Sequence, residues 1–121
     1  MNHESESPST TISASERGRE VMNRLQNSVF IEKMDVYRFA LALGLKENRR
    51  TPLQKKETMF NIGSFDKDRT IAKVVTALTD GDDANVYRLI EEYAETGFAQ
   101  IEMRLSGGEF RFEPFLTPTT L

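Results

Sequence analysis

The sequence predicts an all-α fold: a single domain of four helices with a short extended segment near the C-terminus. Apolar residues recur at three- and four-residue spacing in four windows, as they do along the buried face of an amphipathic helix. Residues that commonly start or stop helices, such as Ser, Asp and Gly, stand at the ends of those windows. The length of 121 residues lies in the usual range of one domain.

The ends of the chain are expected to lie outside the folded domain. Residues 1–11 are rich in Ser, Thr and Glu and have no large apolar side chain after Met1. Burial there cannot offset the entropic cost of ordering the chain. We therefore expect a disordered tail over 1–11, a helical domain over 12–116 and a second tail over 117–121.

The first helix is expected over 14–28, after a short extended stretch at Thr10–Ser13. Ser13 and Glu16 have the spacing of a capping box, in which each side chain accepts a hydrogen bond from a free backbone amide. Val21, Met22 and Leu25 form its apolar face, and Val29 continues the same helical spacing just after its expected end.

The second helix is expected over 35–44. Asp35 is a suitable N-cap, and Gly44 stands where a helix often ends in the left-handed conformation. Leu45 would supply the apolar contact that closes such an end. The apolar face consists of Val36, Phe39, Ala40 and Leu43.

Residues 46–65 show no sustained period and contain Pro52 and Gly63. We expect an irregular connection there, with at most one short helical turn around 53–59. Long irregular connections in small domains are often functional. This one carries a group of cations, opposed only by Glu47 within residues 46–56: Lys46, Arg49, Arg50, Lys55 and Lys56.

The third helix is expected to run from Asp66 to the Asp80–Gly81 pair, with an apolar face of Ile71, Val74, Val75 and Leu78. Asp82 or Asp83 would then cap the fourth helix. Gly97 predicts a bend or break in that helix, which would give two pieces over 84–95 and 98–105. After Gly107–Gly108, Phe residues alternate with polar ones over 109–115, which predicts an extended segment that docks on the helices.

The residues available for chemistry predict a protein that is not an enzyme and needs no cofactor or metal. There is no cysteine, and the only histidine is His3, so neither a His-based triad nor a thiolate site can be assembled. The acidic run that starts at Asp80 lacks the glycine and the third ligand of a calcium loop. No phosphate-binding glycine motif occurs. Three carboxylates of the fourth helix are expected on its solvated face: Glu91, Glu92 and Glu95.

A cytoplasmic location is expected from the composition and from the start of the chain. Cysteine is absent, as is common in reducing compartments. The first residues lack the succession of a signal peptide, and no apolar run approaches the roughly 18 residues that a membrane span needs.

The charge is unevenly distributed along the chain. The net charge is -3, yet residues 31–60 carry seven Lys or Arg against four Asp or Glu, whereas residues 61–121 carry six against eleven. Lys and Arg on a connecting segment neutralise phosphates without reading bases. We therefore expect residues 46–56, called the cationic segment below, to contact the DNA backbone.

Two stretches resemble known families. The succession of TTIS, the capped helix SERGREVMNRL and the helix KMDVYRFALALGL resembles the ribbon-helix-helix arrangement, in which two chains pair their strands and lay the ribbon in the major groove. More narrowly, the second helix, with Asp35, Arg38 and the ending FALALGL, resembles the small DndE family associated with bacterial DNA phosphorothioate modification. The resemblance covers residues 13–45, and the length and four-helix layout are also similar.

This resemblance implies a helical, oligomeric and non-catalytic accessory protein of a DNA-modification or defence system, one that engages DNA, including nicked duplex, through basic surface side chains. The chain departs from that pattern because it is acidic overall and because Thr10–Ser13 carries no Lys, Arg, Asn or Gln to read base edges. Backbone binding is therefore favoured over sequence-specific repression.

Two alternatives remain open from the sequence. In the first, the protein is an adaptor whose acidic third and fourth helices face a basic protein partner, and the cationic segment only connects helices. In the second, it is a dimeric ribbon-helix-helix regulator that recognises a two-fold operator with half-sites about one helical turn apart.

Overall fold

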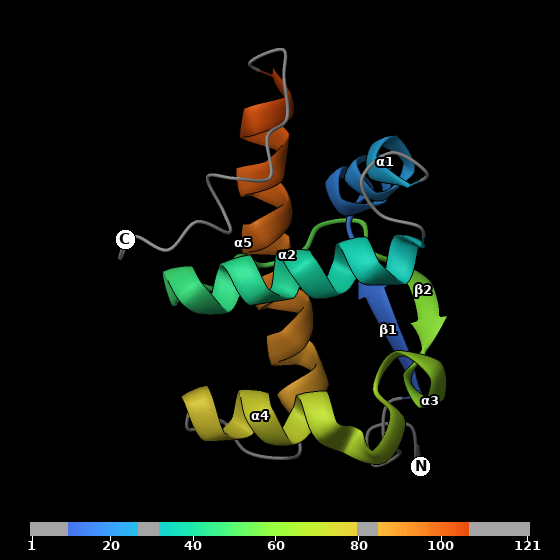
Figure 1. Ribbon diagram of the computed structural model, residues 1–121, viewed down its shortest axis with the longest axis vertical. Coiled ribbons are helices and arrows are strands. Elements are labelled where there is room, and N and C mark those ends of the chain that lie inside the picture. The colour runs from blue at the N-terminus through green and yellow to red at the C-terminus, as the bar shows by residue number, and fades with distance from the viewer. Residues whose placement is uncertain (1–9, 27–31, 80–84, 107–121) are drawn as a thin grey trace.

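The computed structural model describes residues 10–26, 32–79 and 85–106. Helices dominate it, with one small two-stranded antiparallel sheet (Figure 1). The mainly helical class is therefore confirmed, although the helices of the described part do not follow the four-helix division expected. In order, the elements are β1 (Thr11–Ala14), α1 (Glu16–Leu25), α2 (Lys33–Glu47), β2 (Glu57–Asn61), α3 (Ile62–Phe65), a 3-10 turn (Lys67–Arg69), α4 (Thr70–Thr79) and α5 (Val86–Ser106).

Several expectations lie outside the described residues. These are the N-terminal tail up to residue 9, the end of the first helix over 27–28, the caps at 80–83, the extended segment over 109–115 and the tail over 117–121.

Helix α5 is the central element, and α2 lies across its middle (Figure 1). Two glycines permit this crossing. A Cβ added to Gly44 would lie 1.7 Å from the Tyr93 carbonyl oxygen, and one added to Gly97 would lie 1.8 Å from the Ala40 carbonyl oxygen. Each glycine therefore faces the backbone of the other helix, where no side chain fits.

This crossing corrects two expectations about glycine. Gly44 does not end α2, which continues to Glu47 and stops at Asn48 in the left-handed conformation, with φ of 58°. Gly97 does not break α5 into two pieces, because α5 is one helix from Val86 to Ser106. In both cases packing against the neighbouring helix retains the glycine inside a helix despite its low propensity.

The first helix also starts slightly later than expected. The N-cap is Ser15, whose Oγ accepts a hydrogen bond from the Gly18 amide at 3.1 Å. Ser13 belongs to β1 instead, so the expected capping box of Ser13 and Glu16 was wrong. Either serine can accept a hydrogen bond from a first-turn amide, and the pairing of Ser13 in β1 leaves Ser15 as the cap.

The strand β2 was missed, because residues 53–59 were expected to form at most a helical turn. It pairs antiparallel with β1, with Ile12 opposite Phe60 and an irregularity between Ile12 and Ser13. The other edge of β1 is also used within the chain. The Ser13 amide donates to Glu91 Oε2 at 2.8 Å, and the Tyr37 hydroxyl donates to the Ser13 carbonyl oxygen at 2.7 Å.

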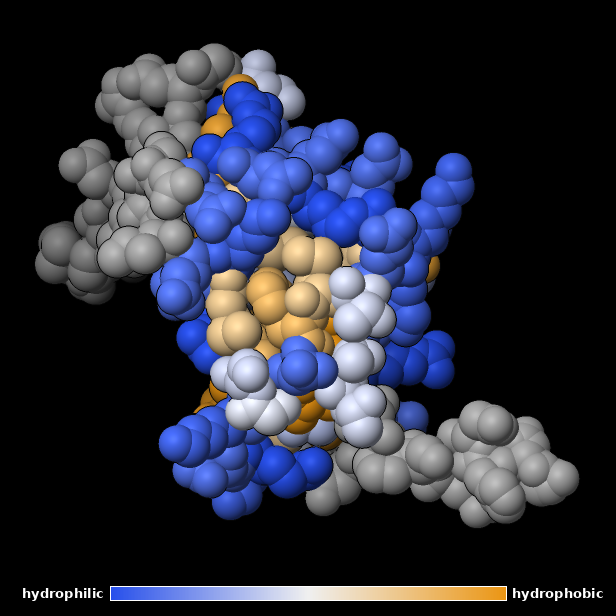
Figure 2. Space-filling model, turned by 90° about the vertical axis from the view of Figure 1, so that its right-hand side faces the viewer, coloured by the Kyte–Doolittle hydropathy of each residue, from blue (hydrophilic) through white to orange (hydrophobic). Residues whose placement is uncertain are grey.

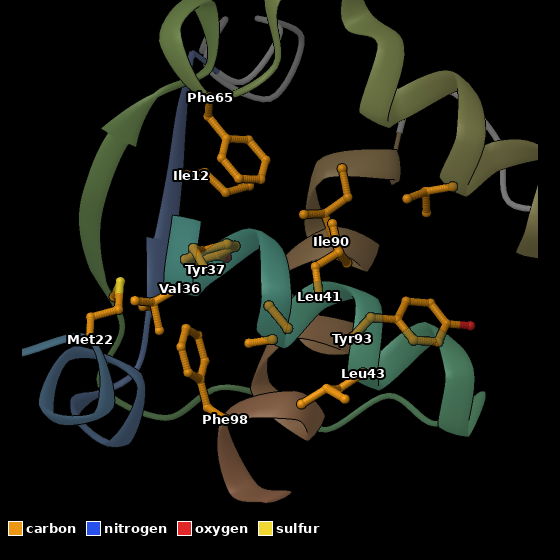
Figure 3. Close-up of a cluster of buried hydrophobic side chains, with 14 of the residues drawn as sticks. Ile12, Met22, Val36, Tyr37, Leu41, Leu43, Phe65, Ile90, Tyr93 and Phe98 are labelled. Atoms are coloured by element: carbon orange, nitrogen blue, oxygen red, sulfur yellow. The ribbon is translucent and has the colours of Figure 1, made fainter. Parts of the chain in front are cut away.

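The core contains an aromatic cluster under the two-stranded sheet of β1 and β2, which is called the ribbon below. Tyr37 lies between Phe65 and Phe98, close to Ile12 (Figure 3). Its ring meets those of Phe65 and Phe98 edge-on, at centroid distances of 5.2 and 5.5 Å. Such pairs add specific geometry to the apolar burial, so the ribbon, α2 and α5 form one packed unit.

The expected third helix begins later than Asp66. The short helix α3 and the 3-10 turn precede α4, which starts at Thr70. Asp66 is buried, with 3% of its surface exposed, and its two carboxylate oxygens accept the Ile71 and Ala72 amides at 2.7 and 3.0 Å. The Tyr87 hydroxyl also donates to it, at 2.9 Å. Asp66 therefore ties the start of α4 to the start of α5.

Candidate nucleic-acid interface

The cationic segment lies along α5 and is attached to it through backbone and hydroxyl contacts. The Thr51 amide donates to the Glu92 carbonyl oxygen at 3.1 Å. The Thr96 hydroxyl donates to the Arg49 carbonyl oxygen at 2.8 Å and lies 2.7 Å from the Thr51 hydroxyl. Although irregular, the segment is thus held in place by residues more than 40 positions away in the sequence.

Two of the expected DNA-binding residues lie over carboxylates of α5. Lys56 Nζ is 3.1 Å from Glu91 Oε1, and Arg50 Nε is 3.8 Å from Glu92 Oε1. The cations are the outer partners in both pairs. The side chains of Lys56 and Arg50 are 54% and 53% exposed, whereas those of Glu91 and Glu92 are 8% and 15% exposed.

The other three expected residues are also on the surface. Arg49 is 4.0 Å from Glu47 at the end of α2, and its side chain is 68% exposed. Lys46, in the last turn of α2, and Lys55, with φ of 53°, are exposed. The structure therefore brings Arg50 and Lys56 together over α5, while Arg49 and Lys46 lie near the end of α2.

The structure adds a cation that the sequence reasoning missed. Arg88 Nε lies 3.4 Å from Glu92 Oε2, so Glu92 is shared between Arg88 and Arg50. The Arg88 side chain is 74% exposed. Only its four-residue spacing from Glu92 could have suggested an ion pair; nothing local links it to the cationic segment.

Arg50, Lys56 and Arg88 are called the cationic rim below. Beside it is a hollow of about 400 Å³ lined by Pro52, Leu53, Lys56, Arg88, Glu91 and Glu92. The rim has three positive charges, and two carboxylates lie beneath it, those of Glu91 and Glu92. One positive charge is therefore left in excess. Because the carboxylates are the buried partners, the positive groups are the ones that solvent meets.

The acidic face of α5 corrects another expectation. Glu91 and Glu95 were expected on a solvated face, yet they are only 7% and 6% exposed. The ribbon, the start of α1 and the cationic segment cover this side of α5. The Ser15 hydroxyl donates to Glu95 Oε1 at 2.6 Å, and Arg17 Nη1 lies 3.6 Å from Glu95 Oε2.

Burial changes the acidity of two groups in this layer. It raises the pKa of Tyr37 well above its ordinary value of 10.0, and the charges of Glu91 and Glu95 raise it further. The tyrosine therefore remains a hydrogen-bond donor. Burial also raises the pKa of Glu95 above its ordinary value of 4.5, against the lowering effects of the Ser15 hydrogen bond and the Arg17 charge.

Replacing Glu95 with glutamine is expected to remove a pH dependence of stability. A carboxyl whose pKa is higher in the folded state contributes stability fully below its unfolded value, here about 4.5, and loses it as the pH rises through the folded value. Glutamine does not ionise. The free energy of unfolding of Glu95→Gln should therefore increase relative to that of the wild type as the pH rises from the unfolded-state pKa through the folded-state pKa. Urea unfolding of both proteins from pH 4 to 8 measures the difference between their unfolding free energies. A difference that does not change with pH would contradict a raised pKa of Glu95.

No group of three or more His, Cys, Asp or Glu within 10–26, 32–79 and 85–106 is placed to hold a metal ion. In the same part of the chain, no helix has both the length and the apolar character of a membrane span.

Arg38, which contributes to the DndE resemblance, makes a packing contact. Its Nη2 donates to the Phe65 carbonyl oxygen at 2.9 Å, and its guanidinium lies 5.6 Å from the centre of the Phe65 ring. The side chain joins α2 to α3. No family model, curated protein or solved structure matches this chain.

Proposed function

We propose that the protein is a non-catalytic, DNA-associated accessory protein of a bacterial DNA-modification or defence system, and that it contacts backbone phosphates through the cationic rim. The observation that supports this most is the layering of charge over α5. The rim cations are more than half exposed, and the carboxylates beneath them are largely buried. A phosphate approaching this face meets guanidinium and ammonium groups first.

The position of the cations favours backbone contact over base recognition. The cationic segment is held against α5, so its side chains lie on the body of the protein and not on an element that could enter a groove. Lys46, Arg49 and Lys55 extend the exposed cations along the same segment. We therefore expect weak, salt-sensitive binding with little sequence preference.

The test is a salt titration of binding to intact and nicked duplex DNA. The variant carries Arg50→Gln, Lys56→Gln and Arg88→Gln together. For every phosphate that the variant no longer neutralises, the plot of log affinity against log salt should become shallower by roughly 0.9. Fluorescence anisotropy between about 50 and 200 mM salt gives the slopes of the variant and the wild type.

A matched control removes the same charge elsewhere. Arg24, Lys67 and Lys73 are exposed on α1, the 3-10 turn and α4, and their triple replacement with glutamine should leave the slope near that of the wild type. Equal slopes for both variants would show that only the net charge matters, which would reject the rim as the contact surface.

The adaptor remains the second candidate, and one observation favours it. Arg49, Arg50 and Lys56 all lie within 4.0 Å of carboxylates of their own chain, and the net charge is -3, so much of the positive charge is already compensated. This function predicts no measurable binding to duplex, nicked or single-stranded DNA at about 50 mM salt, together with stable co-purification with another subunit.

The ribbon-helix-helix regulator has less support. In that arrangement the N-terminal strand pairs with the same strand of a second chain. Here one edge of β1 pairs with β2, and Glu91 and Tyr37 bind its Ser13 backbone on the other side. An intermolecular β1 ribbon would have to break these contacts.

A further inference from the structure

The hollow beside the cationic rim is lined by groups that do not suit a phosphate. Its volume of about 400 Å³ lies within the range of small-molecule sites, about 300 to 1,000 Å³. The side chains of Glu91 and Glu92 line it and are only 8% and 15% exposed. Their charges would repel an anion that entered the hollow. A phosphate therefore binds at the rim, and the hollow suits a group without negative charge.

The hollow also has apolar surface, supplied by Pro52 and Leu53. Leu53 is partly buried, yet it belongs neither to the core cluster nor to the apolar residues packed against the core. It differs in this from Met59 and Phe60 of β2, which do pack against the core. Figure 2, which views the β2 side of the molecule, shows an apolar area at the centre of that face, surrounded by hydrophilic residues. Leu53 thus offers apolar surface that the core does not use.

Glu92 retains the capacity to accept further hydrogen bonds. The two oxygens of Glu91 are engaged, one by a backbone amide of β1 at 2.8 Å and the other by Lys56 Nζ at 3.1 Å. Glu92 has longer contacts, at 3.8 Å from Arg50 Nε and 3.4 Å from Arg88 Nε. A carboxylate has about four lone-pair sites. Glu92 can therefore accept N–H groups of a ligand in the hollow while it keeps both cations.

We propose that the hollow receives an unpaired nucleobase of single-stranded DNA, with Glu92 accepting N–H groups of its Watson–Crick edge. The inference rests on the proposed function, because the rim must hold the phosphates that flank this nucleotide. Pro52 and Leu53 cover a face of the base, as apolar side chains do in other pockets for unstacked bases. In a duplex these N–H groups are paired and the faces are stacked, so only the rim contacts a duplex.

The carboxylate of Glu92 predicts a preference among bases. Cytosine presents an exocyclic amine, from which the carboxylates of Glu and Asp accept hydrogen bonds. Thymine has a carbonyl oxygen at the corresponding position, so that two acceptors would face one another. Oligodeoxycytidine should therefore bind about tenfold more tightly than oligothymidine of equal length, as expected for a hydrogen bond to a charged group.

Fluorescence anisotropy of the full chain at about 50 mM salt compares three DNA ligands of equal length: oligodeoxycytidine, oligothymidine and a duplex of mixed sequence. Charge alone favours the duplex, because its phosphates are more densely spaced. We expect oligodeoxycytidine to bind more tightly than the other two. A duplex that binds most tightly, or equal binding of the two single strands, overturns this inference and leaves the proposed function standing. Absence of binding to all three overturns both.

Two variants of equal charge test the role of Glu92. Glu92→Ala removes the acceptor but keeps the carbonyl oxygen that binds the Thr51 amide, so the cationic segment stays attached to α5. The tenfold ratio between the two single strands should fall to less than about twofold. Glu47→Ala is the matched control, because it removes a carboxylate beside Arg49 and outside the hollow. It should keep the ratio, and a ratio that both variants change equally, or that neither changes, overturns the proposal.

A third variant tests the apolar surface without a change of charge. Leu53→Ser should bind oligodeoxycytidine several-fold more weakly, while the slope of log affinity against log salt stays that of the wild type, because no phosphate contact is lost. The duplex should bind this variant and the wild type equally. Unchanged binding of oligodeoxycytidine, or an equal loss for the duplex, would show that no base lies against Leu53.

Discussion

Replacing Gly97 with alanine is expected to destabilise the protein by about 3 kcal/mol, at the upper end of the usual cost of overpacking. The added Cβ would lie 1.8 Å from the Ala40 carbonyl oxygen, and the atom it meets belongs to backbone. A flexible side chain could rotate away, but here α2 and α5 must separate. For a domain of this size, the melting temperature should fall by roughly 15 °C.

Gly63→Ala is the matched control for this substitution. A Cβ at Gly63 meets nothing within 4 Å, so the same change of residue should alter the melting temperature by only a few degrees. Thermal unfolding followed by circular dichroism compares the two. If Gly97→Ala melts as close to the wild type as Gly63→Ala does, the two helices do not cross at backbone contact.

Replacing Asp66 with alanine should be the second severe change, at about 3 kcal/mol. Three donors, the Ile71 and Ala72 amides and the Tyr87 hydroxyl, would lose their acceptor in a buried place. A buried donor left without a partner costs about 1 to 3 kcal/mol, and an N-cap alone about 1 kcal/mol. The destabilisation should appear as a lower midpoint in urea unfolding.

Two further variants identify the origin of that destabilisation. Tyr87→Phe removes one of the three donors and should cost about 1 kcal/mol. Asp35→Ala makes the same substitution at a surface ion pair with Arg38, 3.6 Å away, and should cost less than about 1 kcal/mol. Equal destabilisation by Asp66→Ala and Asp35→Ala would mean that the carboxylate of Asp66 does not connect α4 to α5.

Local patterns predicted the helices well where one face of a helix is buried. Val36, Ala40 and Leu43 of α2 were expected in the core and are 0%, 0% and 6% exposed. The same kind of pattern predicted Val74 and Leu78 as core residues of α4, yet they are 48% and 66% exposed. The spacing of apolar residues predicts which face of a helix is apolar. It does not predict how much of that face the rest of the described fold buries.

The candidate interface was predicted only in part. The density of Lys and Arg in residues 46–56 is a local property and was visible in the sequence. The rest of the interface comes from α5, 32 to 42 positions away from Arg50 and Lys56. Arg88 completes the cationic rim, and Glu91 and Glu92 are the carboxylates beneath it. No local signal could link them, because the distance between such groups depends on how the connection packs on α5.

The sequence by itself determined the helical class, the lack of cysteine and of any histidine beyond His3, and the cation-rich middle of the chain. These follow from residue type and short-range spacing, which act before the chain folds. The tertiary structure decided what the glycines, serines and glutamates do. Gly44 and Gly97 became contact points instead of a stop and a break, Ser15 became the cap, and Glu91 and Glu95 became buried acceptors. Each of these residues has several locally equivalent roles, and only the close packing of α2, α5 and the ribbon selects one.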